Sequence, residues 1–75
     1  MNMDRIEYPR MYELRQEAGW TQAETAAYLG CSRSAYGSYE RGVRRVPLQV
    51  GIALAKRYHV SLDYLVGHTD VREPY

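Results

Sequence analysis

Residues 21–40 read TQAETAAYLGCSRSAYGSYE, and this stretch predicts two short helices joined by a tight turn. Thr21 and Glu24 have the T-x-x-E spacing of a capping box, in which each side chain accepts a hydrogen bond from the backbone N–H of the other residue. Several alanines follow and favour a helix. Gly30 then supplies a position that is free to adopt a positive φ, so we expect the chain to turn sharply there.

The second helix of the pair is expected at residues 32–41, with Ser32 as its N-cap. Tyr36 and Tyr39 lie three residues apart and share the face that we expect to anchor the helix on the core. The opposite face consists of small or charged residues, namely Arg33, Ser34, Gly37, Ser38 and Arg41. Gly37 costs this helix about 1 kcal/mol relative to Ala. Either the close approach of another molecule or the avoidance of a clash within the domain would explain it.

A further helix precedes the pair. Met11, Leu14 and Ala18 follow the i, i+3, i+7 spacing of one helix face, which we expect to be buried. Pro9 suits the first turn of this helix and Gly19 its C-terminal end. Trp20, the next residue, is expected to point into the core.

Two helices are expected after the pair. The first follows Pro47 and covers residues 48–58, and its core candidates are Ile52, Leu54 and Ala55. His59 stands where Gly often ends a helix, and we interpret it as a residue with positive φ. Ser61 is placed to cap a short fifth helix that ends at Gly67, with Val60 and Leu65 as a hydrophobic staple.

These patterns define an all-α chain of five short helices without strands or internal repeats. We divide it into an N-terminal extension at residues 1–8, a helical domain at residues 9–67, and a polar C-terminal tail at residues 68–75 that is expected to fray. Seventy-five residues suffice for one small domain. No stretch is long and apolar enough for a membrane span, and the N-terminus lacks a signal peptide, so we expect no membrane contact and no export.

Composition and motifs argue against catalysis and against bound groups. The two histidines, His59 and His68, have no partners at metal-ligand spacing. The chain lacks phosphate-loop, dinucleotide and nucleophile-elbow motifs. We therefore expect no enzymatic activity, no metal or other cofactor, and no small-molecule ligand. Cys31 is the only cysteine, and we interpret it as a small buried hydrophobic residue in a protein of a reducing compartment.

The net charge of +1 conceals one basic segment. Residues 33–45 contain four Arg and one Glu, whereas residues 1–32 are net acidic and residues 46–75 are balanced. Such a segment is either a surface for an anionic partner or an ordinary solvated loop.

Residues 21–40 resemble a helix-turn-helix, a motif that has a Gln, a small residue, a turn glycine and two packed apolar residues at set positions. The residues at these positions are Gln22, Ala26, Gly30, Tyr36 and Tyr39. With the surrounding pattern LRQEAGWTQAETAAYLGCSRSAYGSYERG and the later LAKRYHVSLDYLVG, residues 11–67 resemble the phage-repressor and Cro-like (XRE-type) DNA-binding family. The resemblance implies a compact five-helix fold of the lambda-repressor type, in a cytoplasmic protein that a bacterium or phage encodes.

The resemblance also implies roles for individual residues. Helix 32–41 would enter the major groove of double-stranded DNA, where its N-terminal residues meet base edges. Matching the base-reading positions are Arg33, Ser34 and Ser38. Matching the DNA-backbone positions are Thr21, Gln22, Arg41, Arg44 and Arg45, and the hydroxyl of Tyr36 is a further candidate. Arg15 and Glu40 match a structural ion pair between the first and third helices.

Some residues depart from the family pattern. Thr25 stands where the family has Leu, and its hydroxyl can bond back to the preceding turn. Tyr36 replaces Ile or Val, so its hydroxyl needs a partner or an exit to water. Gly37 and Ser38 are smaller than many residues that read bases, which raises the expected contribution of DNA shape.

The expected function is that of a sequence-specific transcriptional regulator, a homodimer on a palindromic operator, that represses by occluding a promoter. The candidate dimer contacts, for which an ordinary core role is the alternative, are Leu62, Tyr64 and Val66. With no second domain expected to sense a ligand, occlusion is the simplest mechanism. A different class of function remains open on the same fold: eight Tyr and one Trp suit a protein-interaction module whose arginines face an acidic partner.

Overall fold

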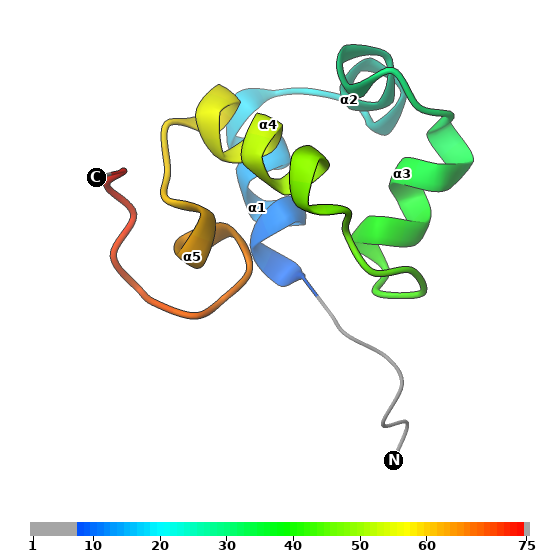
Figure 1. Cartoon of the computed structure of the whole chain (residues 1–75). Helices are drawn as coiled ribbons and strands as arrows, with labels where there is room; N and C mark the ends of the chain where they lie inside the picture. Colours follow the sequence, from blue (N-terminus) through cyan, green and yellow to red (C-terminus); the bar gives the residue numbers. More distant parts are fainter. Residues whose placement is uncertain (1–7, 75) are drawn as a thin grey trace.

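Five helices account for all regular structure in residues 8–74, the part of the chain that the computed structural model describes (Figure 1). They are α1 (Pro9–Ala18), α2 (Gln22–Leu29), α3 (Arg33–Glu40), α4 (Leu48–Tyr58) and α5 (Leu62–Leu65). The expected all-α class and the order of the helices are confirmed. The proposed N-terminal extension, apart from residue 8, and the last residue of the proposed tail lie outside the described residues.

Local hydrogen bonds start α2 and α3, and a glycine ends α2, where the sequence predicts. Thr21 Oγ1 accepts the Glu24 N–H at 3.0 Å and Glu24 Oε1 accepts the Thr21 N–H at 2.8 Å, which completes the expected capping box. Ser32 caps α3 through a 3.0 Å bond from the Ala35 N–H. Gly30 has a φ of 74°, a left-handed conformation that glycine adopts without strain. These contacts set the turn between α2 and α3.

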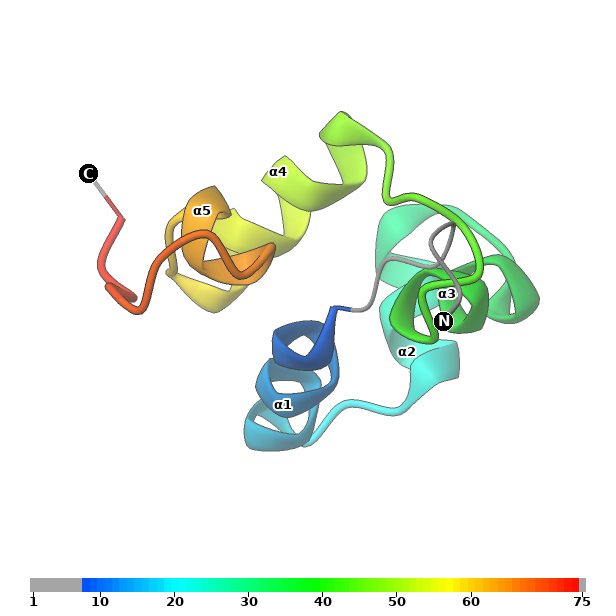
Figure 2. The ribbon, with the colours of Figure 1, turned by 90° about the horizontal axis from the view of Figure 1, so that it is seen from below.

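The α2–α3 pair forms one side of the molecule, whereas α5 and the C-terminal segment lie on the other (Figure 2). Helix α1 contacts both α3 and α5 and therefore connects the two sides. Helix α4 packs against α5. This arrangement leaves the outer surface of α3 uncovered by the other helices.

The core lies between the helices, and its largest fully buried side chains are Tyr36, Met11, Leu54, Leu65 and Thr25. A buried threonine hydroxyl requires a hydrogen-bond partner. Thr25 Oγ1 donates to the Thr21 carbonyl oxygen at 3.0 Å, which confirms the expected bond to the preceding turn. The side chain thus takes the place of a leucine without leaving its hydroxyl unsatisfied.

Three expectations about the core were wrong. Ala18 is exposed, because the buried stripe of α1 runs through Met11, Leu14 and Arg15 instead. Ile52 is 39% exposed, since α4 turns Leu54 and its neighbours inward.

Trp20 does not enter the core but is half-buried at the surface. Its ring makes edge contacts with those of Tyr28 and Tyr58, at centroid distances of 5.4 and 6.5 Å, and the Arg57 guanidinium lies 4.3 Å from it. The amphipathic indole thus forms a surface aromatic cluster.

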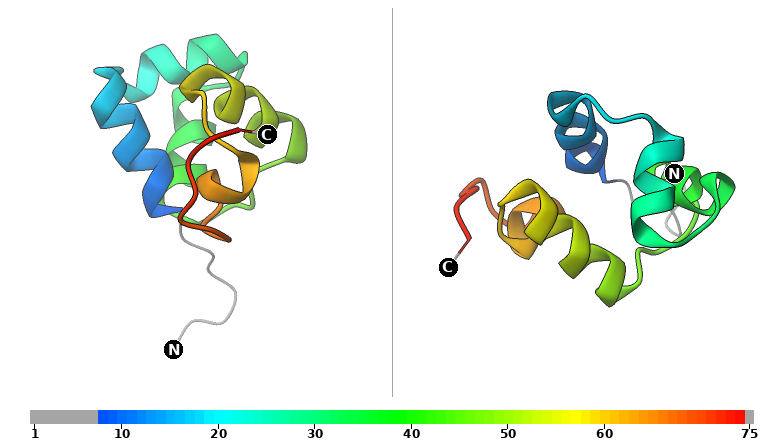
Figure 3. Two further views of the ribbon diagram at one scale, coloured as in Figure 1. Left: turned by 90° about the vertical axis from the view of Figure 1, so that its left-hand side faces the viewer. Right: turned by 90° about the horizontal axis from the view of Figure 1, so that it is seen from above.

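The C-terminal segment, expected to fray, instead folds back over α5 (Figure 3). The Ser61 N–H donates to the Arg72 carbonyl oxygen at 2.8 Å. Arg72 also pairs with Glu17 at 3.0 Å, and Arg10 pairs with Asp70. The expectation of fraying was wrong because these partners come from α1 and the α4–α5 connection, far away in the chain.

Candidate nucleic-acid interface

Two buried tyrosines hold α3 in place. Tyr36 is 0% and Tyr39 9% exposed, so the face that was expected to anchor the helix does so. Ala26 of α2 is only 2% exposed, and its small side chain lets α3 approach closely. Because Tyr36 and Tyr39 fix the rotation of α3 about its axis, the opposite side of this helix points to solvent.

The solvent-facing side of α3 contains the expected base-reading residues. Arg33 and Ser34 are exposed, and Ser38 is half-buried. The Ser38 hydroxyl donates to the Ser34 carbonyl oxygen at 3.0 Å. Its proton is therefore engaged within the helix, and Ser38 offers an external partner mainly its oxygen lone pairs.

The loop after α3 places further arginines beside this face. Arg44 and Arg45 are both exposed. The N–H groups of Val43 and Arg44 donate to the Ser38 carbonyl oxygen at 3.0 and 3.3 Å, which fastens the loop to the end of α3. Guanidinium groups in such a loop can contact phosphates while α3 meets the bases.

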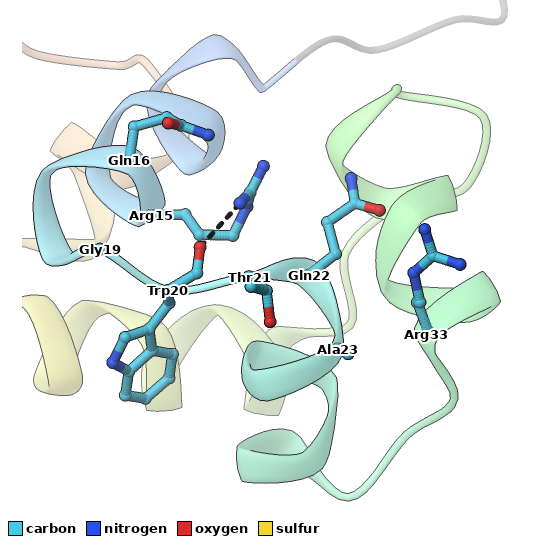
Figure 4. A pocket seen from close by; sticks show the side chains of 8 residues that line it. All are labelled: Arg15, Gln16, Gly19, Trp20, Thr21, Gln22, Ala23 and Arg33. Atoms are coloured by element: carbon cyan, nitrogen blue, oxygen red, sulfur yellow. Dashed lines mark hydrogen bonds between the residues drawn. The ribbon is translucent and has the colours of Figure 1, made fainter.

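A surface depression of about 470 Å³ lies at the N-terminus of α2 (Figure 4). Thr21, Gln22, Arg15 and Arg33 line it, so side chains of α1, α2 and α3 meet there. The first N–H groups of a helix point outward and, with the helix dipole, favour an anion. The structure therefore brings Arg33, expected at the bases, to the same depression as Thr21 and Gln22, expected at the backbone.

Beneath this depression, Arg15 and Glu40 form the ion pair that the family resemblance implies. Arg15 Nε lies 2.7 Å from Glu40 Oε2, and the two side chains are only 8% and 6% exposed. Arg15 Nη1 also donates to the Trp20 carbonyl oxygen at 2.8 Å. Gln22 Nε2 donates to Glu40 Oε1 at 3.3 Å, a contact that the sequence analysis missed. The cluster ties α1, α2 and α3 together.

The ionisation of this cluster follows from its contacts. Burial raises the pKa of Glu40, but hydrogen bonds from Arg15 and Gln22, together with the nearby Tyr36 hydroxyl, outweigh burial and hold it below its usual value. Burial, followed by the neighbouring Glu40, raises the pKa of the Tyr36 hydroxyl. Glu40 is therefore charged and neutralised by Arg15, so it subtracts little from the basic character of the outer surface.

Two expectations about α3 require correction. The hydroxyl of Tyr36 was a candidate for the DNA backbone, but the whole side chain is buried. This hydroxyl lies near Glu40 without a hydrogen-bond partner among the described residues. Gly37 was placed on the exposed face, yet it is buried because other side chains cover it. The burial of Tyr36 in the core and the contact of Gln22 with Gly37 come from the packing of other helices on α3, so the spacing within α3 does not reveal them.

Residues 8–74 contain neither a metal-binding cluster nor a membrane-spanning helix. In this part of the chain, no three His, Cys, Asp or Glu side chains lie close enough together to hold a metal ion. None of the helices described there is long and apolar enough to cross a membrane.

Residues 11–65 match the family described as helix-turn-helix. Three curated proteins of Bacillus subtilis (strain 168) are similar to the chain. An uncharacterized HTH-type transcriptional regulator, YobD, is 37% identical over 65 residues, which are 87% of this chain and 58% of YobD. The HTH-type transcriptional regulator ImmR is 39% identical over 62 residues (83% and 49%), and the regulator AnsR is 37% identical over 67 (89% and 53%).

The chain belongs to the helix-turn-helix family, because the match covers most of its length and both helices of the motif. It spans about half the length of the curated relatives that it matches.

Proposed function

We propose that this chain is a sequence-specific double-stranded DNA-binding regulator of transcription that inserts α3 into the major groove. The observation that carries this proposal is the pairing of two surfaces. An exposed Arg33–Ser34 face lies on a helix held by buried tyrosines, and Arg44 and Arg45 are exposed in the loop fastened to that helix. The transcriptional regulators that match the chain support the same reading.

The proposed DNA contacts fall into base contacts and phosphate contacts. Arg33 can make a bidentate contact with guanine, and Ser34 and Ser38 are short polar readers. Thr21 and Gln22 lie at the first turn of α2, whose free N–H groups bind a phosphate. The loop arginines Arg44 and Arg45 add charge contacts that fix register without reading sequence. No cofactor or catalytic step enters this function.

A homodimer on a palindromic operator completes the proposal, because one domain of this size makes few base contacts. Half-sites would then lie about one helical turn apart. Of the candidate dimer residues, Tyr64 packs within its own protomer: Arg10 lies 4.0 Å from its ring and Arg72 5.5 Å. Leu62 and Val66 also pack against the core, so only the exposed parts of these two side chains are available to a second protomer. Such a dimer represses by occluding a promoter in the bacterial cytoplasm, whether a bacterium or a phage encodes it.

The test is a fluorescence titration of the chain on a random-sequence duplex at several salt concentrations. DNA binding through arginines gives a linear fall of log K with log salt, with a slope of about −0.9 per phosphate contacted. Arg45→Gln should reduce this slope, whereas Lys56→Gln, an exposed charge on α4, serves as the matched control. Absent or salt-independent binding would contradict the proposal and favour a protein-interaction module. Selection from a random DNA library would then define site length and symmetry.

A further inference from the structure

Gly37 lies in the middle of α3 and is covered by two polar side chains. A Cβ atom placed on Gly37 would lie 3.1 Å from Arg41 Nη1 and 3.5 Å from Gln22 Oε1. The guanidinium of Arg41, one helical turn further on, thus lies back across α3 instead of extending from its end. Glycine within a helix lowers stability relative to alanine, so its presence here needs a reason. The reason is that Arg41 Nη1 and Gln22 Oε1 occupy the space that a larger side chain would need.

The polarity of the contacts explains why these two groups meet over Gly37. The carboxylate of Glu40 only accepts hydrogen bonds, so it turns the amide nitrogen of Gln22 toward itself, at 3.3 Å. The amide oxygen of Gln22 consequently points the other way, into the gap above Gly37. Guanidinium only donates, so Arg41 presents the matching polarity there. The buried pair Arg15–Glu40 therefore sets the orientation of Gln22.

We propose that Gly37 is a positioning residue: it leaves room for the Arg41 guanidinium beside Gln22, and Arg41 then binds a DNA phosphate at the N-terminus of α2. This inference rests on the proposed DNA-binding function and assigns Arg41 to a different phosphate contact from the loop arginines Arg44 and Arg45. Residues 33, 37 and 41 are spaced by four, so they share one side of α3. Arg41 therefore lies along the side of α3 that carries Arg33. Gln22, whose amide oxygen lies above Gly37 together with Arg41 Nη1, lines the depression in Figure 4.

Placement of the Arg41 guanidinium beside Gln22 favours phosphate binding for a physical reason. A guanidinium carries five N–H groups in a fixed plane, so one edge can face the Gln22 oxygen while another binds a phosphate in bidentate fashion. Holding a long side chain in its binding conformation also removes part of the entropy cost of association. A longer residue at position 37 would occupy the space of the guanidinium and release Arg41 into solvent.

Variants at position 37 test this inference. Gly37→Ala adds only a Cβ, whereas Gly37→Gln fills the space with a side chain that favours a helix. On a random-sequence duplex, we expect Gly37→Gln and Arg41→Ala each to weaken binding about tenfold. Gly37→Gln should also reduce the salt slope by about 0.9, the loss of one phosphate contact. Gly37→Ala should show a smaller loss of affinity. The melting temperature should not fall in either variant, which separates positioning from folding.

Combined variants identify the partner. Gly37→Gln should cause no further loss of affinity in an Arg41→Ala background but keep its full effect in an Arg45→Ala background, which is the matched control. Equal losses in both backgrounds would overturn the inference, because Gly37 would then meet DNA directly. Unchanged affinity for Gly37→Gln would overturn it as well.

Nuclear magnetic resonance distinguishes this inference from the proposed function. In the wild-type chain without DNA, Arg41 side-chain protons should show nuclear Overhauser effects to the Gly37 α-protons, and Gly37→Gln should show no such contact between position 37 and the guanidinium. Absence of these effects in the wild type would overturn the placement of Arg41. Their presence in a chain that binds no duplex would contradict the proposed function and the phosphate contact, while the placement would stand.

Discussion

Arg15 and Glu40, 25 residues apart in the chain, are joined by hydrogen bonds of 2.7 and 3.2 Å beneath the face of α3. The pair connects α1 to the last residue of α3 and also engages Gln22 at the start of α2. A rigid connection of this kind fixes the angle at which α3 leaves the body of the protein. The geometry of the proposed DNA-binding surface therefore depends on a contact that touches no DNA.

Glu40→Ala should destabilise the protein by about 3–5 kcal/mol, because it leaves the Arg15 guanidinium buried without its acceptor. Urea denaturation measures the free energy of unfolding. The double variant Arg15→Met/Glu40→Leu is the control, since replacing both charges with apolar groups should recover most of the loss. A double variant as unstable as the single one would show that the unpaired charge is not the cause.

Acid should weaken the fold through Glu40. Its pKa in the folded protein lies below the ordinary value of 4.5, because hydrogen bonds from Arg15 and Gln22, together with the nearby Tyr36 hydroxyl, outweigh the effect of burial. A carboxyl whose pKa is lowered by folding stabilises the fold above its unfolded-state pKa, and this stabilisation is lost as the pH falls through the folded-state value. The free energy of unfolding should therefore fall below about pH 4.5.

The control for acid sensitivity is Glu40→Gln, which cannot titrate. The difference in the free energy of unfolding between wild type and this variant should shrink as the pH falls from 6 toward 3. A constant difference over that range would rule out Glu40 as the group responsible.

Tyr36→Phe should leave DNA affinity unchanged, because the hydroxyl is buried and cannot meet a phosphate. Stability should change by less than about 1.5 kcal/mol, the net contribution of a typical hydrogen bond. Titration on a duplex and thermal unfolding measure the two effects. A marked loss of affinity in a variant of normal melting temperature would restore Tyr36 as a DNA contact.

Arg33→Ala and Arg45→Ala should have different effects on DNA binding. Loss of Arg33 should remove about 1–3 kcal/mol of discrimination between a selected site and random DNA, since a base contact carries specificity. Loss of Arg45 should weaken binding to both duplexes alike and reduce the salt slope by about 0.9. Parallel titrations on the two duplexes provide the comparison. If both variants weaken both duplexes equally, Arg33 contacts phosphate in the depression that it shares with Gln22.

His59→Gly should stabilise the protein by about 0.5–1 kcal/mol. His59 has a φ of 57°, the only positive φ of a residue other than glycine within the described residues 8–74. A left-handed backbone conformation costs a residue with a Cβ about 1–2 kcal/mol, and glycine avoids this cost. Glycine loses more conformational entropy on folding, which cancels part of the gain. Gly30→Ala, at a φ of 74°, should have the opposite sign. Thermal unfolding checks both, and a lower melting temperature for His59→Gly would contradict the argument.

Several features of the fold could be predicted because their causes are local. The capping box of Thr21 and Glu24 and the Ser32 cap each depend on residues three positions apart. The left-handed conformation of Gly30 and of His59 follows from which residues tolerate positive φ. Tyr36 and Tyr39 could be assigned to the buried face of α3 from their spacing alone.

Contacts between distant residues were harder to predict. Burial of Arg15 in place of Ala18 depends on the acceptor that Glu40 offers, and no periodicity in α1 shows it. The folded-back tail depends on Arg72 reaching Ser61 and Glu17. These interactions come from the packing of whole helices, so nothing in their local sequence distinguishes the residues involved from ordinary surface residues.

By itself, the sequence predicted the five helices that residues 8–74 form, and it identified a helix-turn-helix through residues 21–40. Caps, turn glycines and helix periodicity act over a few residues, so they can be recognised in the chain. The family resemblance implied the pair of Arg15 with Glu40, but only the tertiary structure decided that Gln22 joins Glu40 and that Arg41 lies at the space above Gly37. Those contacts exist because packing brings three helices together at one point. The strength of a hydrogen bond or ion pair there depends on the distance between its atoms in space and not on their separation along the chain.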